Sequence, residues 1–166
     1  MRSKGFTVFF EPKALYNSVD AAAVIPDDFE VPFGKARIRR EGKDLSIITY
    51  GNTTLFSLAA AERLAKEDWD VEVIDIRSLI PLDKEAIFQS VKKTSKALVV
   101  HEDKVFSGFG AEIAAMINSK VFQFLDAPVQ RVGSTFTPVG FNPILEKAVL
   151  PGGDRIYQAA KKLLEF

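Results

Sequence analysis

The chain has 166 residues, of which 47% are apolar, and this is enough for one compact domain with a buried core. Its 22 basic and 22 acidic residues cancel and form no long block of one sign, so we expect no nucleic-acid or anionic-lipid partner. Cysteine is absent, which excludes disulfides, thiolate nucleophiles and thiolate-bound metal clusters. No apolar run approaches the roughly 18 residues that span a bilayer. The chain also begins without a recognisable targeting peptide, so we predict a cytoplasmic protein that does not enter membranes.

The first 41 residues show no regular succession of elements. The run Phe6–Phe10 is β-branched and aromatic and predicts a strand that ends before Pro12. Residues 11–41 contain several prolines and weak periodicity, which predicts an extended connector with one helical turn near Ala21. A connector of this length is unusual inside one compact domain. We therefore predict that residues 1–41 are the last strand of a missing domain plus a linker, and that the main domain is 42–166.

After Gly42, apolar strands and amphipathic helices alternate along the chain. The strands are predicted at 45–50, 71–76, 97–101 and 129–132, and the helices at 53–66, 81–92, 110–118, 142–150 and from Asp154 onward. Alternation of this kind is typical of an α/β fold, in which a mostly parallel sheet is covered by helices on both faces.

His101 is the single histidine and stands at the predicted carboxyl end of a strand, before Glu102 and Asp103. Sites of α/β proteins usually lie at this edge of the sheet, which makes proton transfer conceivable. No cysteine or other candidate nucleophile stands nearby to complete a triad with it. We interpret His101 as a structural or interface histidine and predict no catalytic residue.

Two glycine-containing turns could each either bind an anion or simply lead into a helix. The segment Ser107–Ile113 is similar to a dinucleotide fingerprint, but Ile113 occupies the position of the third glycine, so a tight loop is the favoured interpretation. Gly51–Thr54 could hold an anion or cap the following helix. Carboxylates are spread over separate strand ends, so no dedicated metal site is predicted.

Seven blocks of sequence occur in an order that resembles a known family. They are Phe9–Tyr16, Val31–Ala36, Arg39–Asp44, Asp75–Asp83, His101–Asp103, Ser107–Ile113 and Leu125–Val132. Together they resemble the β subunit of the decarboxylating component of thiamine-diphosphate-dependent 2-oxoacid dehydrogenases. Residues 9–13 and the His101-Glu102 pair are closer to the branched-chain members, whereas Leu125–Pro128 also suits the pyruvate enzymes, so the substrate stays open. The resemblance implies a transketolase-type carboxyl-terminal domain, with three α/β/α layers and about five strands.

The resemblance implies that this domain assembles the enzyme and is inactive alone. A full β subunit of the family also has a pyrimidine-binding domain, and thiamine diphosphate with its magnesium lies between that domain and the α subunit. No cofactor-contacting motif therefore carries over to this chain. The complete enzyme would decarboxylate a 2-oxoacid oxidatively and transfer the acyl group to a lipoyl group. Here the domain would contact the α subunit, a second β subunit and the dihydrolipoyl acyltransferase core.

Five residues are candidate interaction residues on the same resemblance. Near its carboxyl terminus the family docks the small binding domain of the acyltransferase core, and Glu165 with the carboxylate of Phe166 would present negative charge to that domain. A frayed end is the alternative. Asp126, Arg131 and His101, which lie in the matching blocks, are the other candidates.

Two further interpretations belong beside this one. The chain could be a stand-alone domain that binds an anion or small molecule near Gly51, Asp75 and His101. Related transketolase-like enzymes, such as deoxyxylulose-phosphate synthase and pyruvate:ferredoxin oxidoreductase, share the fold, but residues 9–13 and Leu125–Pro128 argue against them. Exposed apolar side chains in Phe6–Phe10 favour self-association, so a homodimer is predicted.

Overall fold

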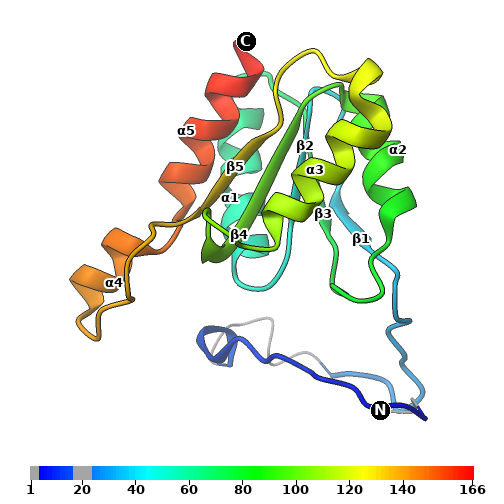
Figure 1. Ribbon diagram of the computed structural model, residues 1–166, viewed down its shortest axis with the longest axis vertical. Helices are drawn as coiled ribbons and strands as arrows, with labels where there is room; N and C mark the ends of the chain where they lie inside the picture. Colours follow the sequence, from blue (N-terminus) through cyan, green and yellow to red (C-terminus); the bar gives the residue numbers. More distant parts are fainter. Residues whose placement is uncertain (1–3, 17–23) are drawn as a thin grey trace. The chain divides into compact units, whose positions relative to one another are not determined.

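The computed structural model describes residues 4–16 and 24–166, and the contacts divide the chain into two units, Met1–Glu30 and Val31–Phe166. The larger unit contains a five-stranded sheet in the order β1-β3-β2-β4-β5 (Figure 1). Its strands are β1 Arg37–Arg40, β2 Leu45–Thr49, β3 Val71–Asp75, β4 Ala97–Lys104 and β5 Gln130–Ser134. Neighbours among β2 to β5 are parallel, whereas β1 is antiparallel to β3. The predicted α/β class with a mostly parallel sheet is confirmed.

Helices cover both faces of this sheet (Figure 1). The elements are α1 Thr53–Ala65, α2 Lys84–Thr94, α3 Gly110–Val121, α4 Pro143–Val149 and α5 Gly153–Leu164, with the short 3₁₀ turn η3 Phe122–Phe124 after α3. Helices α1 and α5 enclose one apolar cluster, which includes Leu45 and Ile47 of β2. Helices α2 and α3 enclose the other, which includes Ile48. Because β2 is covered on both faces, its residues are apolar almost without alternation.

Local sequence explains where the helices begin. The Asp83 carboxylate accepts a hydrogen bond from the backbone N–H of Ala86 (3.3 Å) and so caps α2. The side chain of Asn142 accepts one from the N–H of Ile144 (2.9 Å), and Pro143 occupies the first turn of α4. Both starts agree with the sequence prediction.

The predicted domain boundary at residue 41 needs a correction, because β1 belongs to the sheet. Arg37 lies opposite Asp75 and Ile38 opposite Ile74. The sequence Arg-Ile-Arg-Arg has little of the β-branched and aromatic character that marked the other strands. Basic side chains are common on edge strands, where they repel one another and so discourage pairing between two copies of the same edge. The division between the two units therefore falls at Glu30, ahead of the predicted position.

The smaller unit contains the 3₁₀ turn η1 Lys13–Leu15 and a hydrogen bond from the Tyr16 hydroxyl to the Glu11 carboxylate. Phe6–Phe10 forms no strand, so that prediction is wrong. A strand needs a neighbour for its backbone N–H and C=O groups, and residues 4–16 and 24–30 supply none. The assignment of this segment to a missing domain stays a prediction. The helical turn expected near Ala21 lies outside the described residues.

Candidate functional site

His101 lies in β4 with no solvent-exposed area and packs against the turn that begins α3. Three glycines make room for its imidazole. A Cβ atom at Gly110 would lie 2.2 Å from Nε2, and Cβ atoms at Gly108 and Gly133 would lie 2.9 and 3.1 Å from Cε1. Such distances exclude a larger residue at Gly110 without movement of the ring. The glycines of the 107–113 segment therefore serve the packing of His101, which supports the tight-loop interpretation.

Burial also shifts the pKa values of His101 and of the neighbouring Tyr50. Both ring nitrogens of His101 lack a hydrogen-bond partner among the described residues. Burial lowers the pKa of His101, Asp103 opposes this shift, and Arg131 reinforces it. The Tyr50 ring stacks on the imidazole with centroids 6.2 Å apart, and burial together with Asp103 raises the pKa of Tyr50 to about 12. Burial therefore favours the neutral form of both rings, His101 being inaccessible to solvent and Tyr50 half-buried, and this favours a structural role over proton transfer.

The Gly51–Thr54 turn also lies at this carboxyl edge of the sheet. The Asn52 amide donates to both oxygens of Glu102, at 3.1 and 3.2 Å. The hydroxyl of Thr53 donates to the Tyr50 carbonyl at 2.8 Å and lies 2.8 Å from the Thr49 hydroxyl. A carboxylate beside the turn repels anions, so the geometry favours a helix start over an anion site.

The five predicted interaction residues fall into two groups, and the first consists of His101 and Arg131. Arg131 lies in β5 beside β4, donates to the Val105 carbonyl at 2.7 Å and acts electrostatically on His101. Asp126, Glu165 and Phe166 belong to the opposite, amino edge of the sheet. The N–H of Asp126 donates to Ser95 (2.8 Å), and Lys96 donates to the Leu164 carbonyl (2.9 Å).

The loop at residues 95 and 96 therefore holds the segment of Asp126 and the end of α5. Asp126, Glu165 and Phe166 are exposed, whereas His101 is inaccessible. A direct contact between His101 and a partner would require the α3 turn to open, while Asp126, Glu165 and Phe166 need no such change.

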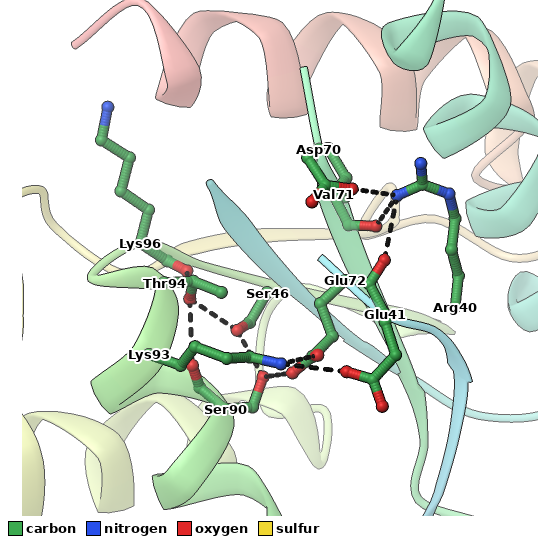
Figure 2. Close-up of polar contacts among 10 residues, drawn as sticks. All are labelled: Arg40, Glu41, Ser46, Asp70, Val71, Glu72, Ser90, Lys93, Thr94 and Lys96. Atoms are coloured by element: carbon green, nitrogen blue, oxygen red, sulfur yellow. Dashed lines mark hydrogen bonds and ion pairs between the residues drawn. The ribbon is translucent and has the colours of Figure 1, made fainter. Parts of the chain in front are cut away.

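A buried polar network, which we call the Glu72 network, lies at the amino ends of β2 and β3 (Figure 2). Its members are Glu41, Ser46, Glu72, Ser90, Lys93 and Thr94. The Glu72 side chain has no exposed area, accepts a hydrogen bond from the Ser90 hydroxyl (2.5 Å) and pairs with Lys93. Ser46 lies within 2.5 and 2.6 Å of the Ser90 and Thr94 hydroxyl oxygens. The network fastens α2 to the sheet.

Lys93 supplies the positive charge of the Glu72 network. It also pairs with Glu41 at 3.1 Å. Burial lowers the pKa of Lys93, but hydrogen bonds to Glu72 and Glu41 outweigh burial and raise it overall. Sequence reasoning missed this network, although a glutamate inside an apolar strand was its signal, because buried charges are almost always paired.

The chain between β5 and α5 forms a projecting arm, which we define as residues 135–149 and which contains α4 (Figure 1). The N–H of Thr135 donates to the Val149 carbonyl at 3.2 Å and closes the base of the arm. Arg155 donates to the carbonyls of Gly133 (2.9 Å) and Val149 (3.2 Å) at the same base. Large apolar side chains of the arm are exposed: Phe136 72%, Val139 48%, Phe141 105%, Ile144 78% and Leu145 57%.

An apolar groove of about 370 Å³ lies between the segment before α2 and the first turns of α3. Leu79–Leu82, Phe109 and Met116 line it, together with the charged residues Lys84 and Glu112.

Within residues 4–16 and 24–166, no group of His, Asp and Glu side chains is arranged to hold a metal ion. In the same residues, every helix is too short or too polar to cross a bilayer.

Comparison with known proteins agrees with this architecture. Residues 34–156 match the family described as transketolase, C-terminal domain. The 2-oxoisovalerate dehydrogenase subunit beta of Bacillus subtilis is 38% identical over 167 residues, which is 100% of this chain and 51% of that protein. The pyruvate dehydrogenase E1 component subunit beta of Rickettsia felis is 38% identical, over 100% of this chain and 50% of that protein. The acetoin:2,6-dichlorophenolindophenol oxidoreductase subunit beta of Bacillus subtilis is 39% identical, over 94% of this chain and 45% of that protein.

A solved structure shows the same fold. It is titled split gene transketolase, inactive beta4 tetramer, and has a TM-score of 0.71 and 29% sequence identity over 86% of this chain and 45% of its own. The chain thus spans about half the length of the proteins that it matches. The order of the strands, the helices on both faces and the matched residues lead to one conclusion: the chain belongs to the transketolase C-terminal domain family.

Proposed function

We propose that this chain is the subunit-interface domain of a thiamine-diphosphate-dependent 2-oxoacid dehydrogenase and is inactive alone. The relatives described above are named as β subunits of enzymes that act on 2-oxoisovalerate and pyruvate. The chain matches about half of each. The complete enzyme would decarboxylate its 2-oxoacid oxidatively and pass the acyl group to a lipoyl group.

The described residues do not fit a diphosphate with its magnesium ion. No cluster of metal-ligating side chains exists among them. His101 is enclosed by glycines, and the Nδ2 atom of Asn52, the donor that could face a phosphate, already donates to Glu102. We therefore assign thiamine diphosphate and magnesium to other parts of the complete enzyme.

The observation that carries the proposal is the arm. Two phenylalanines of the arm, Phe136 and Phe141, are 72% and 105% exposed. The 68% exposed Phe106 from the loop after β4 joins them, because its ring lies 4.9 Å from that of Phe136 between centroids. At roughly 150–250 Å² for each aromatic side chain, these three expose roughly 400–600 Å². Summed over the three side chains, the exposed apolar area is comparable to that of the largest patch on a typical monomer, before the aliphatic side chains of the arm are added. A surface of this kind is typical of a subunit interface.

The proposed partners are the α subunit, a second β subunit and the dihydrolipoyl acyltransferase core. The apolar arm suits the permanent subunit contacts, because obligate interfaces are more apolar than transient ones. Exposed Asp126, Glu165 and Phe166 suit the core, because a basic docking module would need accessible negative charge.

Co-expression with an α subunit and the missing β portion of a 2-oxoacid dehydrogenase tests the proposal. We expect a complex that purifies together and oxidises a 2-oxoacid, and we expect Phe141→Ser with Ile144→Ser to abolish assembly. The control is Phe122→Ser, a phenylalanine with 68% exposure outside the arm. An arm variant that assembles as well as the wild type would contradict the proposal.

Calorimetry with thiamine diphosphate and magnesium is a second test. We expect no binding to this chain alone and binding once the other parts are added. Tight binding by the isolated chain would place a cofactor site in it and overturn the assignment.

A further inference from the structure

The edge strand β1 carries more positive charge than its surroundings neutralise. It is the outermost strand of the sheet: it pairs with β3 on one side, and its other side faces no strand within the described residues (Figure 1). Arg37, Ile38 and Arg39 are exposed, and Ile38 retains 44% of its surface. An open strand edge presents backbone N–H and C=O groups to any extended peptide that can approach it.

The cations of this edge gather around one carboxylate. Arg37 lies opposite Asp75 in the register, and an Nη1 atom of Arg39 lies 3.9 Å from Asp75 Oδ2. The backbone N–H of Arg77 donates to Asp75 Oδ1 at 3.0 Å. All three arginines act electrostatically on Asp75, whose side chain is only 15% exposed. One carboxylate therefore faces three guanidinium groups.

Neighbouring charges do not remove this excess. The Asp83 carboxylate accepts hydrogen bonds from the N–H groups of Ala36 (3.1 Å) and Ala86 (3.3 Å). Asp70 pairs with Arg40 at 3.2 Å, and Glu41 pairs with Lys93. Asp70 thus has a cation of its own and Glu41 shares Lys93 with Glu72, whereas the backbone donors of Asp83 leave its negative charge in place. Around β1 the cations still exceed the carboxylates: Lys35, Arg37, Arg39 and Arg77 stand against Asp75 and Asp83.

Arg77 keeps the entry to β1 in place. Its guanidinium donates to the carbonyl of Lys35 at 3.0 and 2.7 Å and to that of Ala36 at 3.2 Å. The backbone before β1 is thereby held against β3. The edge is consequently a preformed, extended surface, and an added strand would not have to order it.

We infer that the outer edge of β1 binds an extended acidic segment of a partner polypeptide. The spacing defines its chemistry. Side chains two residues apart on a strand lie on one face about 6.6 Å apart. Acidic residues at two such positions would pair with Arg37 and Arg39, and an apolar residue between them would cover Ile38. The register of β1 shifts between Ile38 and Arg40, so its regular ladder ends at Ile38, and the added strand would form its backbone hydrogen bonds along Arg37 and Ile38. This mode is strand addition, in which the backbone gives affinity and the side chains give specificity.

Titration calorimetry at low salt, with a capped synthetic peptide of alternating glutamate and valine, tests the inference on the full chain. We expect binding that weakens as salt is added. Arg37→Gln with Arg39→Gln should weaken it about tenfold, the effect of losing two exposed charge pairs. Lys66→Gln is the matched control, because Lys66 is an exposed cation at the end of α1 and not part of β1. Hydrogen exchange should slow at Arg37–Arg39 when the peptide binds.

Two peptides separate strand addition from simple charge attraction. A lysine–valine peptide should not bind, and a glutamate–valine peptide with alternate backbone amides methylated should lose binding. The inference is overturned if the wild-type chain does not bind the acidic peptide. It is also overturned if Lys66→Gln weakens binding as much as the arginine variants, or if backbone methylation has no effect. Thermal unfolding of each variant confirms that its fold is intact. None of these results depends on assembly with an α subunit, so the inference and the proposed function fail separately.

Discussion

A Cβ atom at Gly110 would lie 2.2 Å from Nε2 of His101, far inside the contact distance of two non-bonded atoms. Gly110→Ala should therefore destabilise the fold by about 1–3 kcal/mol, as overpacking does. Helix propensity alone predicts the opposite sign, since alanine is favoured over glycine in helices. Urea denaturation measures the difference. Gly152→Ala is the control, because no heavy atom lies within 4 Å of its Cβ position, and it should change stability by at most about 0.5 kcal/mol.

The same contact predicts non-additivity. In a His101→Ala background the space beside position 110 is open, so Gly110→Ala should cost less there than in the wild type. The four proteins of this cycle are compared by their free energies of unfolding in urea. An equal cost in both backgrounds would show that the imidazole is not what excludes a side chain at position 110.

Acid should destabilise the protein through His101. Its pKa is lowered in the folded state by burial, so between its ordinary value near 6.5 and the lower folded value, the unfolded chain binds a proton that the folded chain does not. This contribution to stability is complete above that ordinary value and is lost as the pH falls through this window. Unfolding free energies of the wild type and His101→Phe, measured from pH 8 to pH 5, should diverge as the pH falls. As the chain has a single histidine, NMR titration of its imidazole gives the folded pKa directly.

Removal of Lys93 should expose the dependence of the Glu72 network on a counter-charge. Lys93→Met leaves the buried Glu72 carboxylate with the Ser90 hydroxyl as its remaining partner. We expect a loss of about 1–3 kcal/mol, less than for a fully buried pair because Lys93 is 41% exposed. Lys92→Met is the control on the same helix; it removes a cation–π contact with Phe124 (5.6 Å) and should cost at most about 1 kcal/mol. Adding Glu72→Gln to Lys93→Met should recover part of the loss, since a neutral amide needs no counter-charge. A Lys93→Met protein as stable as the Lys92→Met protein would refute this account.

Arg155 should control the arm separately from the core. Arg155→Met removes donors to the carbonyls of Gly133, Val149 and Leu150. Hydrogen exchange should accelerate at 135–149 while the strands keep their protection. Lys162→Met, an exposed position on the same helix α5, should leave exchange in the arm unchanged. Uniformly faster exchange across the sheet would mean that Arg155 supports the core and not the arm in particular.

Much of the fold was predictable, because a strand or helix that buries one or both faces shows a characteristic spacing of apolar residues along the sequence. The strands at 45–50 and 71–76 were expected within one residue of β2 and β3, and Asp83 and Asn142 were recognised as helix starts. Phe6–Phe10 shows the limit of that reasoning. Its composition suits a strand, but strands form only beside a partner, and composition does not say whether one is present.

The sequence by itself determined the α/β class, the positions of most elements and the likeness to the transketolase-type domain, since these depend on short patterns and ordered blocks. Only the tertiary structure decided that β1 joins the sheet, that three glycines from two segments enclose His101 and that Glu72 meets Lys93. Apart from Gly108 and Gly110, which follow His101 closely, these contacts join residues that lie far apart along the chain. The order of the strands and the packing of the helices decide which residues meet, so no local period in the sequence could reveal these contacts.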